Sequence, residues 1–182
     1  MSASASSAPA PIWTDMAQVF VAAGSNVEPQ ANLARAVAEL ARIFNELQVS
    51  PWYQNRAVGF QGEDFINFVF GFHTQRGVHD TVGQLREVET LCGRPRNAPK
   101  WAARAMDLDV LLYDDLVLDE PQLKLPRPDL LVRAYMLGPL ADIAPELRHP
   151  TQGRTIAQLW AAFDRQAHEM IPVRPATIVR RP

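Results

Sequence analysis

Residues 106–113, Met-Asp-Leu-Asp-Val-Leu-Leu-Tyr, form an apolar run that is interrupted only by two aspartates. A run of this length and composition predicts a β-strand. Successive side chains of a strand point to opposite faces, so we expect Asp107 and Asp109 on one face while Leu108 and Val110 point into the core. The strand therefore brings two carboxylates close together.

The segments before this strand predict an alternation of strands and helices. Short apolar runs rich in β-forming residues predict strands at residues 18–23, 47–53 and 65–74. Apolar residues at helical spacing predict helices at residues 29–44 and 78–92. With the strand that carries the aspartates, the order is βαββαβ. This order is typical of an α+β, ferredoxin-like sandwich, in which helices cover one face of an antiparallel sheet.

Further elements and two tails are predicted around this sandwich. A small hairpin and two C-terminal helices are expected at residues 116–118 with 123–125, at 133–143 and at 155–168. We expect a single domain over residues 18–170, because one core of roughly 100 to 200 residues is the common case. Residues 1–17 begin with a stretch rich in Ser, Ala and Pro, and residues 171–182 contain several prolines and arginines. These segments predict a disordered N-terminal tail and an irregular C-terminal tail.

The overall composition limits the partners and the compartment that we expect. The 182 residues are 47% hydrophobic and 21% charged, with a formal net charge of -2 and a pI of about 6.1. No global charge therefore attracts the chain to nucleic acid or to an anionic membrane. Residues 1–11 lack the features of a signal peptide or an anchor, and the single Cys92 cannot form an internal disulfide. We expect a cytoplasmic protein with small-molecule partners, and the oligomeric state is not specified by the sequence.

The two aspartates need a counter-charge, a cation or protonation of one of them, because neighbouring carboxylates repel each other. A basic segment without acidic residues leads into their strand and contains Arg94, Arg96, Lys100 and Arg104. Hard carboxylate oxygens suit Mg²⁺, and a metal beside a basic loop is the combination that phosphoryl-type transfer uses. The sequence therefore favours a polyphosphate site. The simpler alternative is a solvated surface loop.

The basic segment also contains Trp101, which would either stack on a planar ring or pack the loop. The sequence contains no Gly-x-x-x-x-Gly-Lys-Ser/Thr segment, so side chains rather than a glycine-rich loop would hold the phosphates.

An ordered set of short motifs resembles the 6-hydroxymethyl-7,8-dihydropterin pyrophosphokinases of folate synthesis. The matching stretches are Ala-Gly-Ser-Asn at 23–26, Ser-Pro-Trp-Tyr at 50–53, Asp-Phe-Ile-Asn at 64–67, Gly-Arg-Pro-Arg at 93–96, Asp-Leu-Asp-Val-Leu-Leu-Tyr at 107–113, Leu-Pro at 125–126, Arg-Ala-Tyr at 133–135 and Pro-Leu-Ala-Asp-Ile-Ala-Pro at 139–145. Each motif is weak alone, but the ordered set from about Val19 to Trp160 is specific.

The resemblance implies a ferredoxin-like core and transfer of the β,γ-pyrophosphate of ATP to a pterin hydroxymethyl oxygen, with release of AMP. It implies that Asp107 and Asp109 hold two Mg²⁺ ions and that Arg94 and Arg104 stabilise the transfer. The positions expected on the nucleotide side are Glu89, Arg96, Lys100, Trp101, Val110 and Arg133. The positions expected around the pterin are Asn55, Val58, Phe65, Asn67 and Tyr135.

The chain departs from the family pattern inside this site. Lys100, Ala102 and Ala103 replace an Arg and a Gly-Pro pair, Arg127 replaces a histidine, and Arg56 places a cation near the pterin. These changes leave two alternatives to the standard enzyme. One is a paralogue that acts on another pterin-like alcohol, and the other is a pterin- or nucleotide-binding protein without turnover.

Overall fold

A computed structural model describes residues 16–57, 62–94 and 104–175 of the chain. Its centre is an antiparallel sheet in the strand order β5-β1-β4-β3-β8, with a short β2 also paired to β4. The strands are β1 (Ala17–Ser25), β2 (Gln48–Val49), β3 (Trp52–Asn55), β4 (Phe65–Thr74), β5 (Asp107–Tyr113) and β8 (Ile171–Val173). The order of β5, β1, β4 and β3 confirms the predicted ferredoxin-like sandwich.

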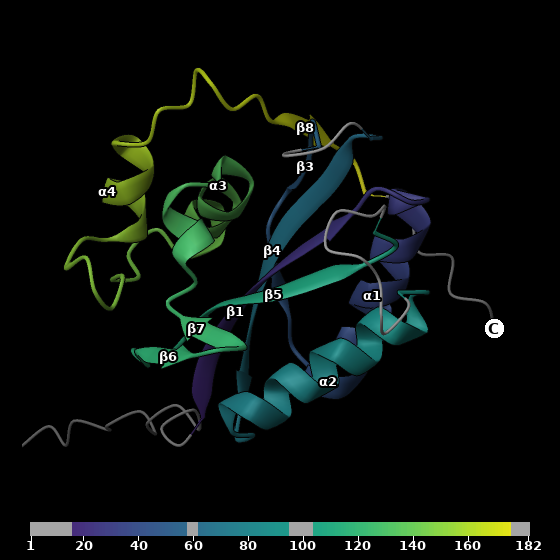
Figure 1. The fold of residues 1–182 in the computed structure, drawn as a ribbon, viewed down its shortest axis with the longest axis horizontal. Helices are drawn as coiled ribbons and strands as arrows, with labels where there is room; N and C mark the ends of the chain where they lie inside the picture. Colours follow the sequence, from purple (N-terminus) through teal and green to yellow (C-terminus); the bar gives the residue numbers. More distant parts are fainter. Residues whose placement is uncertain (1–15, 58–61, 95–103, 176–182) are drawn as a thin grey trace, which may run out of the picture.

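Helices lie on both faces of the sheet (Figure 1). The long helices α1 (Pro29–Phe44) and α2 (Val78–Leu91) cover one face, as predicted. The helices α3 (Ala134–Ile143) and α4 (Ile156–Ala161) cover part of the other face. This second layer is needed because the central strands carry apolar side chains on both faces, and both sets must be shielded from water.

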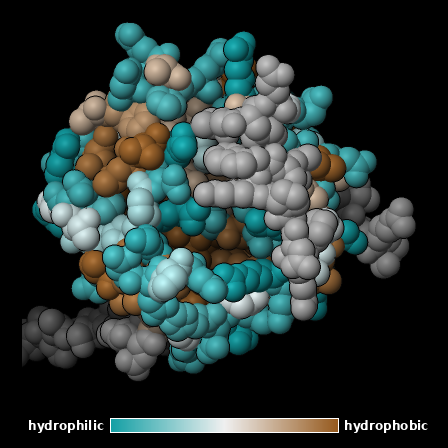
Figure 2. All heavy atoms as spheres, viewed as in Figure 1, coloured by the Kyte–Doolittle hydropathy of each residue, from teal (hydrophilic) through white to brown (hydrophobic). Residues whose placement is uncertain are grey.

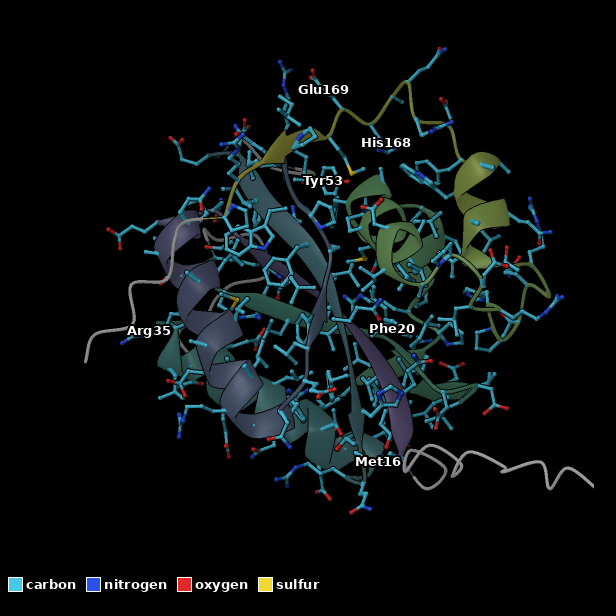
Figure 3. All side chains as sticks on the ribbon, turned by 180° about the vertical axis from the view of Figure 1, so that it is seen from behind. Met16, Phe20, Arg35, Tyr53, His168 and Glu169 are labelled. Atoms are coloured by element: carbon cyan, nitrogen blue, oxygen red, sulfur yellow. The ribbon has the colours of Figure 1, made fainter. Side chains whose placement is uncertain are left out.

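Strand β1 shows how the two cores divide the sheet. Val19, Val21 and Ala23 belong to the cluster under α1 and α2, whereas Phe20 and Ala22 belong to the cluster under α3 and α4. Alternation along the strand therefore separates two hydrophobic cores. Tyr53, labelled in Figure 3, ties the second layer to the sheet, because its hydroxyl donates a hydrogen bond of 2.8 Å to Asp142 of α3.

The predicted strand at 47–53 is divided by Ser50 and Pro51 into β2 and β3. Ser50 keeps this break attached to β4, because its N–H donates to the Val69 carbonyl at 2.9 Å and its hydroxyl accepts from the Val69 N–H at 3.0 Å. A hydroxyl thus takes the place of one backbone acceptor in the ladder.

The C-terminal elements differ from the prediction in two places. Ile171–Val173, expected to be irregular, form β8 at the edge of the sheet. Pro172 has no N–H to donate, and an edge strand tolerates this because only one of its sides is paired. The helix expected at 155–168 ends at Ala161, because the Phe163 N–H bonds to the Trp160 carbonyl at 3.2 Å and tightens the last turn.

The predicted hairpin is present as β6 (Leu118–Glu120) and β7 (Leu123–Leu125), followed by the 3₁₀ turn η1 (Pro128–Leu131). No helix within the described ranges is long and apolar enough to cross a membrane. The expected disordered tail at 1–17 lies outside the described residues up to residue 15, and β1 already begins at Ala17.

Gly71 offers a test of the packing between β1 and β4. It lies directly opposite Phe20, and an added Cβ would lie 2.7 Å from the Phe20 ring, which is 2% exposed. We expect Gly71→Ala to lower the free energy of unfolding by about 1–3 kcal/mol through overpacking. Urea unfolding monitored by circular dichroism measures this change.

The matched control is Gly83→Ala on the exposed side of α2, where an added Cβ meets nothing within 4 Å. This substitution should raise the free energy of unfolding by roughly 0.5–1 kcal/mol, because alanine favours helix. Equal effects of the two substitutions would contradict the packing described for Gly71.

Candidate active site

A cavity of about 430 Å³ opens on the α3 side of the sheet, where β5, β1 and β4 meet. Its floor is wide because β1 carries Ala22 and Gly24 opposite Asp109 and Asp107. The cavity is lined by Ala22, Ala23, Gly24, Asn55, Phe65, Asn67, Arg104, Asp107, Asp109, Arg127, Asp129, Arg133, Tyr135 and Met136. Figure 2 shows one face of the molecule, where hydrophobic atoms lie in a central hollow and hydrophilic atoms surround it.

Asp107 and Asp109 face this cavity together, whereas Leu108 and Val110 lie in the opposite core. The alternation predicted for this strand is therefore confirmed. Val110, expected on the nucleotide side, has a side chain that is 5% exposed and packs under α1 and α2, so only its backbone faces that side.

Two arginines hold Asp107. The Arg94 guanidinium donates to Asp107 Oδ1 at 2.6 Å, and the Arg104 guanidinium donates to Asp107 Oδ2. Arg104 is fixed in turn by its backbone, because its N–H donates to Asn26 Oδ1 at 2.7 Å and its carbonyl accepts from the Asn26 N–H at 3.0 Å. The turn after β1 thus positions the residue that ends the basic segment.

Glu89 lies behind this cluster, at the C-terminal end of α2. Its carboxylate accepts from the Leu108 N–H at 2.8 Å and from the Arg94 guanidinium, and the residue is 8% exposed. Burial raises the pKa of Glu89, while the Leu108 N–H and the Arg94 charge oppose that change. In this structure Glu89 therefore holds Arg94 and the start of β5 in position, and its expected place on the nucleotide side stays a prediction.

Against the effect of burial, the two acidic neighbours of Arg94 raise the pKa of its guanidinium. Burial alone would lower its pKa, but the carboxylates of Asp107 and Glu89 outweigh burial and raise it. Its guanidinium is therefore a fixed positive charge between α2 and β5.

Asp109 has a different partner, which the sequence prediction did not assign to the site. Arg127 Nη1 lies 3.1 Å from Asp109 Oδ1, and Arg127 Nε lies 3.4 Å from Asp129 Oδ2. Asp129 also faces Arg133, whose Nε lies 3.9 Å from Oδ1. Burial first, and then the charge of Asp107, raise the pKa of Asp109 to about 7. The only sequence signal for Arg127 was its departure from the resembling motif.

The chemistry of these groups fits a hard divalent cation. In the described part of the chain no cluster of three or more His, Cys, Asp or Glu side chains could hold a metal, and the cavity presents the neighbouring carboxylates of Asp107 and Asp109. Mg²⁺ commonly binds through one or two carboxylates and completes its shell with water and substrate phosphates. Two carboxylates at an open cavity meet that requirement.

The other side of the cavity, across β1 from the aspartates, is built from amides and aromatic rings. Asn67 lies on β4 opposite Gly24, and its amide donates to Asn55 Oδ1 on β3 at 2.6 Å. Phe65 from β4 and Tyr135 from α3 also line this side. An added Cβ at Gly24 would lie 2.3 Å from Asn67 Oδ1, so the glycine is required for this amide to lie across the floor.

The structure thus brings together most of the predicted site residues that it describes. Asn55, Phe65, Asn67, Arg104, Asp107, Asp109, Arg133 and Tyr135 share one cavity, with Arg94 and Glu89 behind Asp107. Of the other predicted residues, Val110 has its side chain in the opposite core, and four lie outside the described ranges: Val58, Arg96, Lys100 and Trp101.

The family model and two curated relatives that match this chain are named for the same enzyme. A family model for 7,8-dihydro-6-hydroxymethylpterin-pyrophosphokinase matches residues 20–145. A 2-amino-4-hydroxy-6-hydroxymethyldihydropteridine pyrophosphokinase from Pseudomonas aeruginosa is 36% identical over 159 residues, which cover 85% of this chain and 97% of the relative. A protein of the same name from Synechocystis is 35% identical over 158 residues, covering 85% of this chain and 80% of the relative.

The fold is also found among solved structures. The crystal structure of wild-type Plasmodium falciparum HPPK-DHPS superimposes with a TM-score of 0.64 at 12% sequence identity. The match covers 80% of this chain and 44% of that chain, so this chain spans less than half the length of the solved protein. At this identity the likeness concerns the fold alone.

Glu89 offers a test of how the cluster is held. We expect Glu89→Ala to lower the free energy of unfolding by about 2–4 kcal/mol, because it leaves the buried Leu108 N–H without its acceptor and removes one of the two carboxylates that pair with Arg94. Chemical denaturation measures the loss. The exposed Glu87 on the same helix is the control, and Glu87→Ala should change stability by less than about 0.5 kcal/mol. A Glu89→Ala protein as stable as this control would contradict the positioning role.

Proposed function

The chain belongs to the 7,8-dihydro-6-hydroxymethylpterin-pyrophosphokinase family, and we propose that it transfers pyrophosphate from ATP to the hydroxymethyl group of 6-hydroxymethyl-7,8-dihydropterin. The reaction depends on Mg²⁺, releases AMP and serves folate synthesis. One observation carries the proposal: a single cavity presents Asp107 and Asp109 on one side of β1 and the Asn55–Asn67 amide pair on the other.

The acceptor side suits a flat heterocycle. Asn55 and Asn67 provide amide donors and acceptors for the edge of a pterin ring, and their mutual hydrogen bond fixes both before substrate arrives. Phe65 and Tyr135 provide aromatic faces on the same side of the cavity. Burial raises the pKa of Tyr135, so its hydroxyl stays neutral at physiological pH. A stacked ring would direct its hydroxymethyl group across Gly24 toward the carboxylates.

The transfer moves one group between two oxygens. The acceptor hydroxyl oxygen forms a bond to the β-phosphorus and loses its proton, while the bond from the β-phosphorus to the oxygen bridging the α-phosphate breaks. AMP leaves with that bridging oxygen. Arg94 and Arg104 hold the Asp107 carboxylate in place, and positive charge beside the transferred group offsets the charge that develops there.

Asp107 and Asp109 would hold the Mg²⁺ ions, which neutralise phosphate oxygens and orient the polyphosphate. Arg133, which lines the cavity beside Asp129, would contact the nucleotide. The two Mg²⁺ ions and the nucleotide contacts of Arg96, Lys100 and Trp101 form part of the proposal through the family resemblance.

Isosteric replacement of the carboxylates tests this assignment. We expect Asp107→Asn and Asp109→Asn each to lower kcat by at least about a hundredfold, because the amide neither holds a cation nor carries charge. AMP release from ATP, Mg²⁺ and 6-hydroxymethyl-7,8-dihydropterin measures the loss. Asp119→Asn in the exposed hairpin is the control and should leave kcat unchanged. Full activity in either site variant would reject the cation assignment.

The same assay, repeated with several pterin alcohols, separates the standard activity from its alternatives. AMP release only with a different pterin alcohol would indicate a paralogue. Tight pterin binding without AMP release, insensitive to Asp107→Asn, would indicate a binding protein and would overturn the proposed reaction.

The raised pKa of Asp109 predicts a pH dependence of cation binding. Because this pKa lies at about 7, the carboxyl holds a proton in part of the population at neutral pH, and Mg²⁺ must displace that proton. Affinity should therefore rise by about tenfold between about pH 6 and about pH 8, with protons released on binding. Isothermal titration calorimetry in buffers of different ionisation enthalpy measures both quantities. An affinity that is flat over this range would contradict the prediction.

A further inference from the structure

The two carboxylates of the site are held by arginines that are themselves fixed to different extents. Asp107 faces Arg94 and Arg104, and both arginines are themselves fixed, Arg94 by Glu89 and Arg104 by the backbone contacts to Asn26. Asp109 faces a guanidinium from another part of the chain, Arg127, which follows β7. The Asp109 contact is therefore the one that depends on a single side chain.

The backbone of Arg127 is held by hydrogen bonds, whereas its side chain is held less completely. Its N–H donates to the Leu111 carbonyl at 2.9 Å, and its carbonyl accepts from the Leu130 N–H at 3.1 Å. Its Nε is buried and, within the part of the chain that the structure describes, has no hydrogen-bond partner. Asp129 Oδ2 lies 3.4 Å away without the geometry of a hydrogen bond. A buried donor without an acceptor costs free energy, so this orientation of the guanidinium is not fully satisfied.

The same carboxylate oxygen cannot serve Arg127 and a divalent cation equally well. Arg127 Nη1 lies 3.1 Å from Asp109 Oδ1, inside the cavity where the proposed function puts Mg²⁺ and polyphosphate. An opposite charge within about 4–6 Å favours an ionised carboxylate by the equivalent of 1–3 pH units, and any second cation must compete with that stabilisation. A guanidinium that loses Asp109 has phosphate as the natural alternative acceptor, which it binds through a planar fork of donors.

We propose that Arg127 couples cation binding to nucleotide binding. Without nucleotide it is the counter-cation of Asp109 and weakens the binding of a divalent cation there. When nucleotide and cation enter together, the cation takes Asp109 and the Arg127 guanidinium turns to the polyphosphate in the same cavity. The inference rests on the proposed function, and it concerns an arginine at a position where the resembling family carries a histidine. A histidine is largely neutral at pH 7 and would not compete with a cation in this way.

The test measures the affinity of Mn²⁺, a spectroscopic substitute for Mg²⁺, by electron paramagnetic resonance on the full chain. Titrations are made with and without α,β-methylene ATP, an analogue whose α–β linkage cannot be broken. All titrations share one pH and one ionic strength, because screening by salt changes the affinity of a charged ligand. The ratio of the two affinities measures the coupling between cation and nucleotide.

In Arg127→Gln, Mn²⁺ should bind the nucleotide-free chain about tenfold more tightly than in the unmodified protein, and the coupling ratio should fall by about tenfold. Arg127→Lys, which keeps the charge without the planar fork, should give an intermediate ratio. Arg148→Gln is the control, because its guanidinium bonds to the Gly153 carbonyl at 3.0 Å in the loop before α4. It should change neither affinity.

An unchanged coupling ratio in Arg127→Gln would overturn the proposal, because a purely structural arginine would change both affinities by the same factor. If Arg127→Gln does not fold, the ratio in Arg127→Lys decides the question in the same way. Asp109→Asn separates this proposal from the proposed function. If that substitution leaves Mn²⁺ affinity unchanged, the cation site itself is wrong. If it removes binding while the Arg127 variants keep the original ratio, only the coupling role of Arg127 fails.

Discussion

The charge cluster of Glu89, Arg94, Asp107 and Arg104 is the interaction on which the site depends. It joins the end of α2, the first residue of β5 and the last residue of the basic segment. Each charge in the cluster has an opposite neighbour, which is the condition for keeping such groups partly buried. The cluster also holds the Leu108 N–H through Glu89, so the start of the strand and its first carboxylate are fixed by the same contact.

The cavity is open because β1 carries small residues at its floor. Ala22 and Gly24 sit on β1 between the carboxylates of β5 and the amides of β4 and β3, where larger residues would close the cavity. The opposite face of the same strands is filled by large apolar residues under α1 and α2. One strand can therefore stabilise the core with one face and form the floor of a polar site with the other.

The sequence predicted those features that follow from local periodicity. Alternation in residues 106–113 was sufficient to place Asp107 and Asp109 on one face, because a strand allows only two directions for a side chain. The roles of Glu89 and Arg127 depend on which loops meet across the sheet, and no local pattern encodes those distances. Strand β8 was missed because three residues that include Pro172 resemble a tail until β3 offers them a partner. Arg96, Lys100 and Trp101 lie outside the described ranges, so their expected roles stay predictions.

The proposed reaction of this cavity transfers a pyrophosphoryl group rather than a single phosphoryl group. The direct measurement is the fate of ATP labelled in its β-phosphate, followed by separation of products after incubation with Mg²⁺ and 6-hydroxymethyl-7,8-dihydropterin. Pyrophosphoryl transfer predicts that the label leaves the nucleotide and appears in a pterin diphosphate, with unlabelled AMP formed in equal amount. Label retained in ADP, or released as free phosphate without a pterin product, would contradict it.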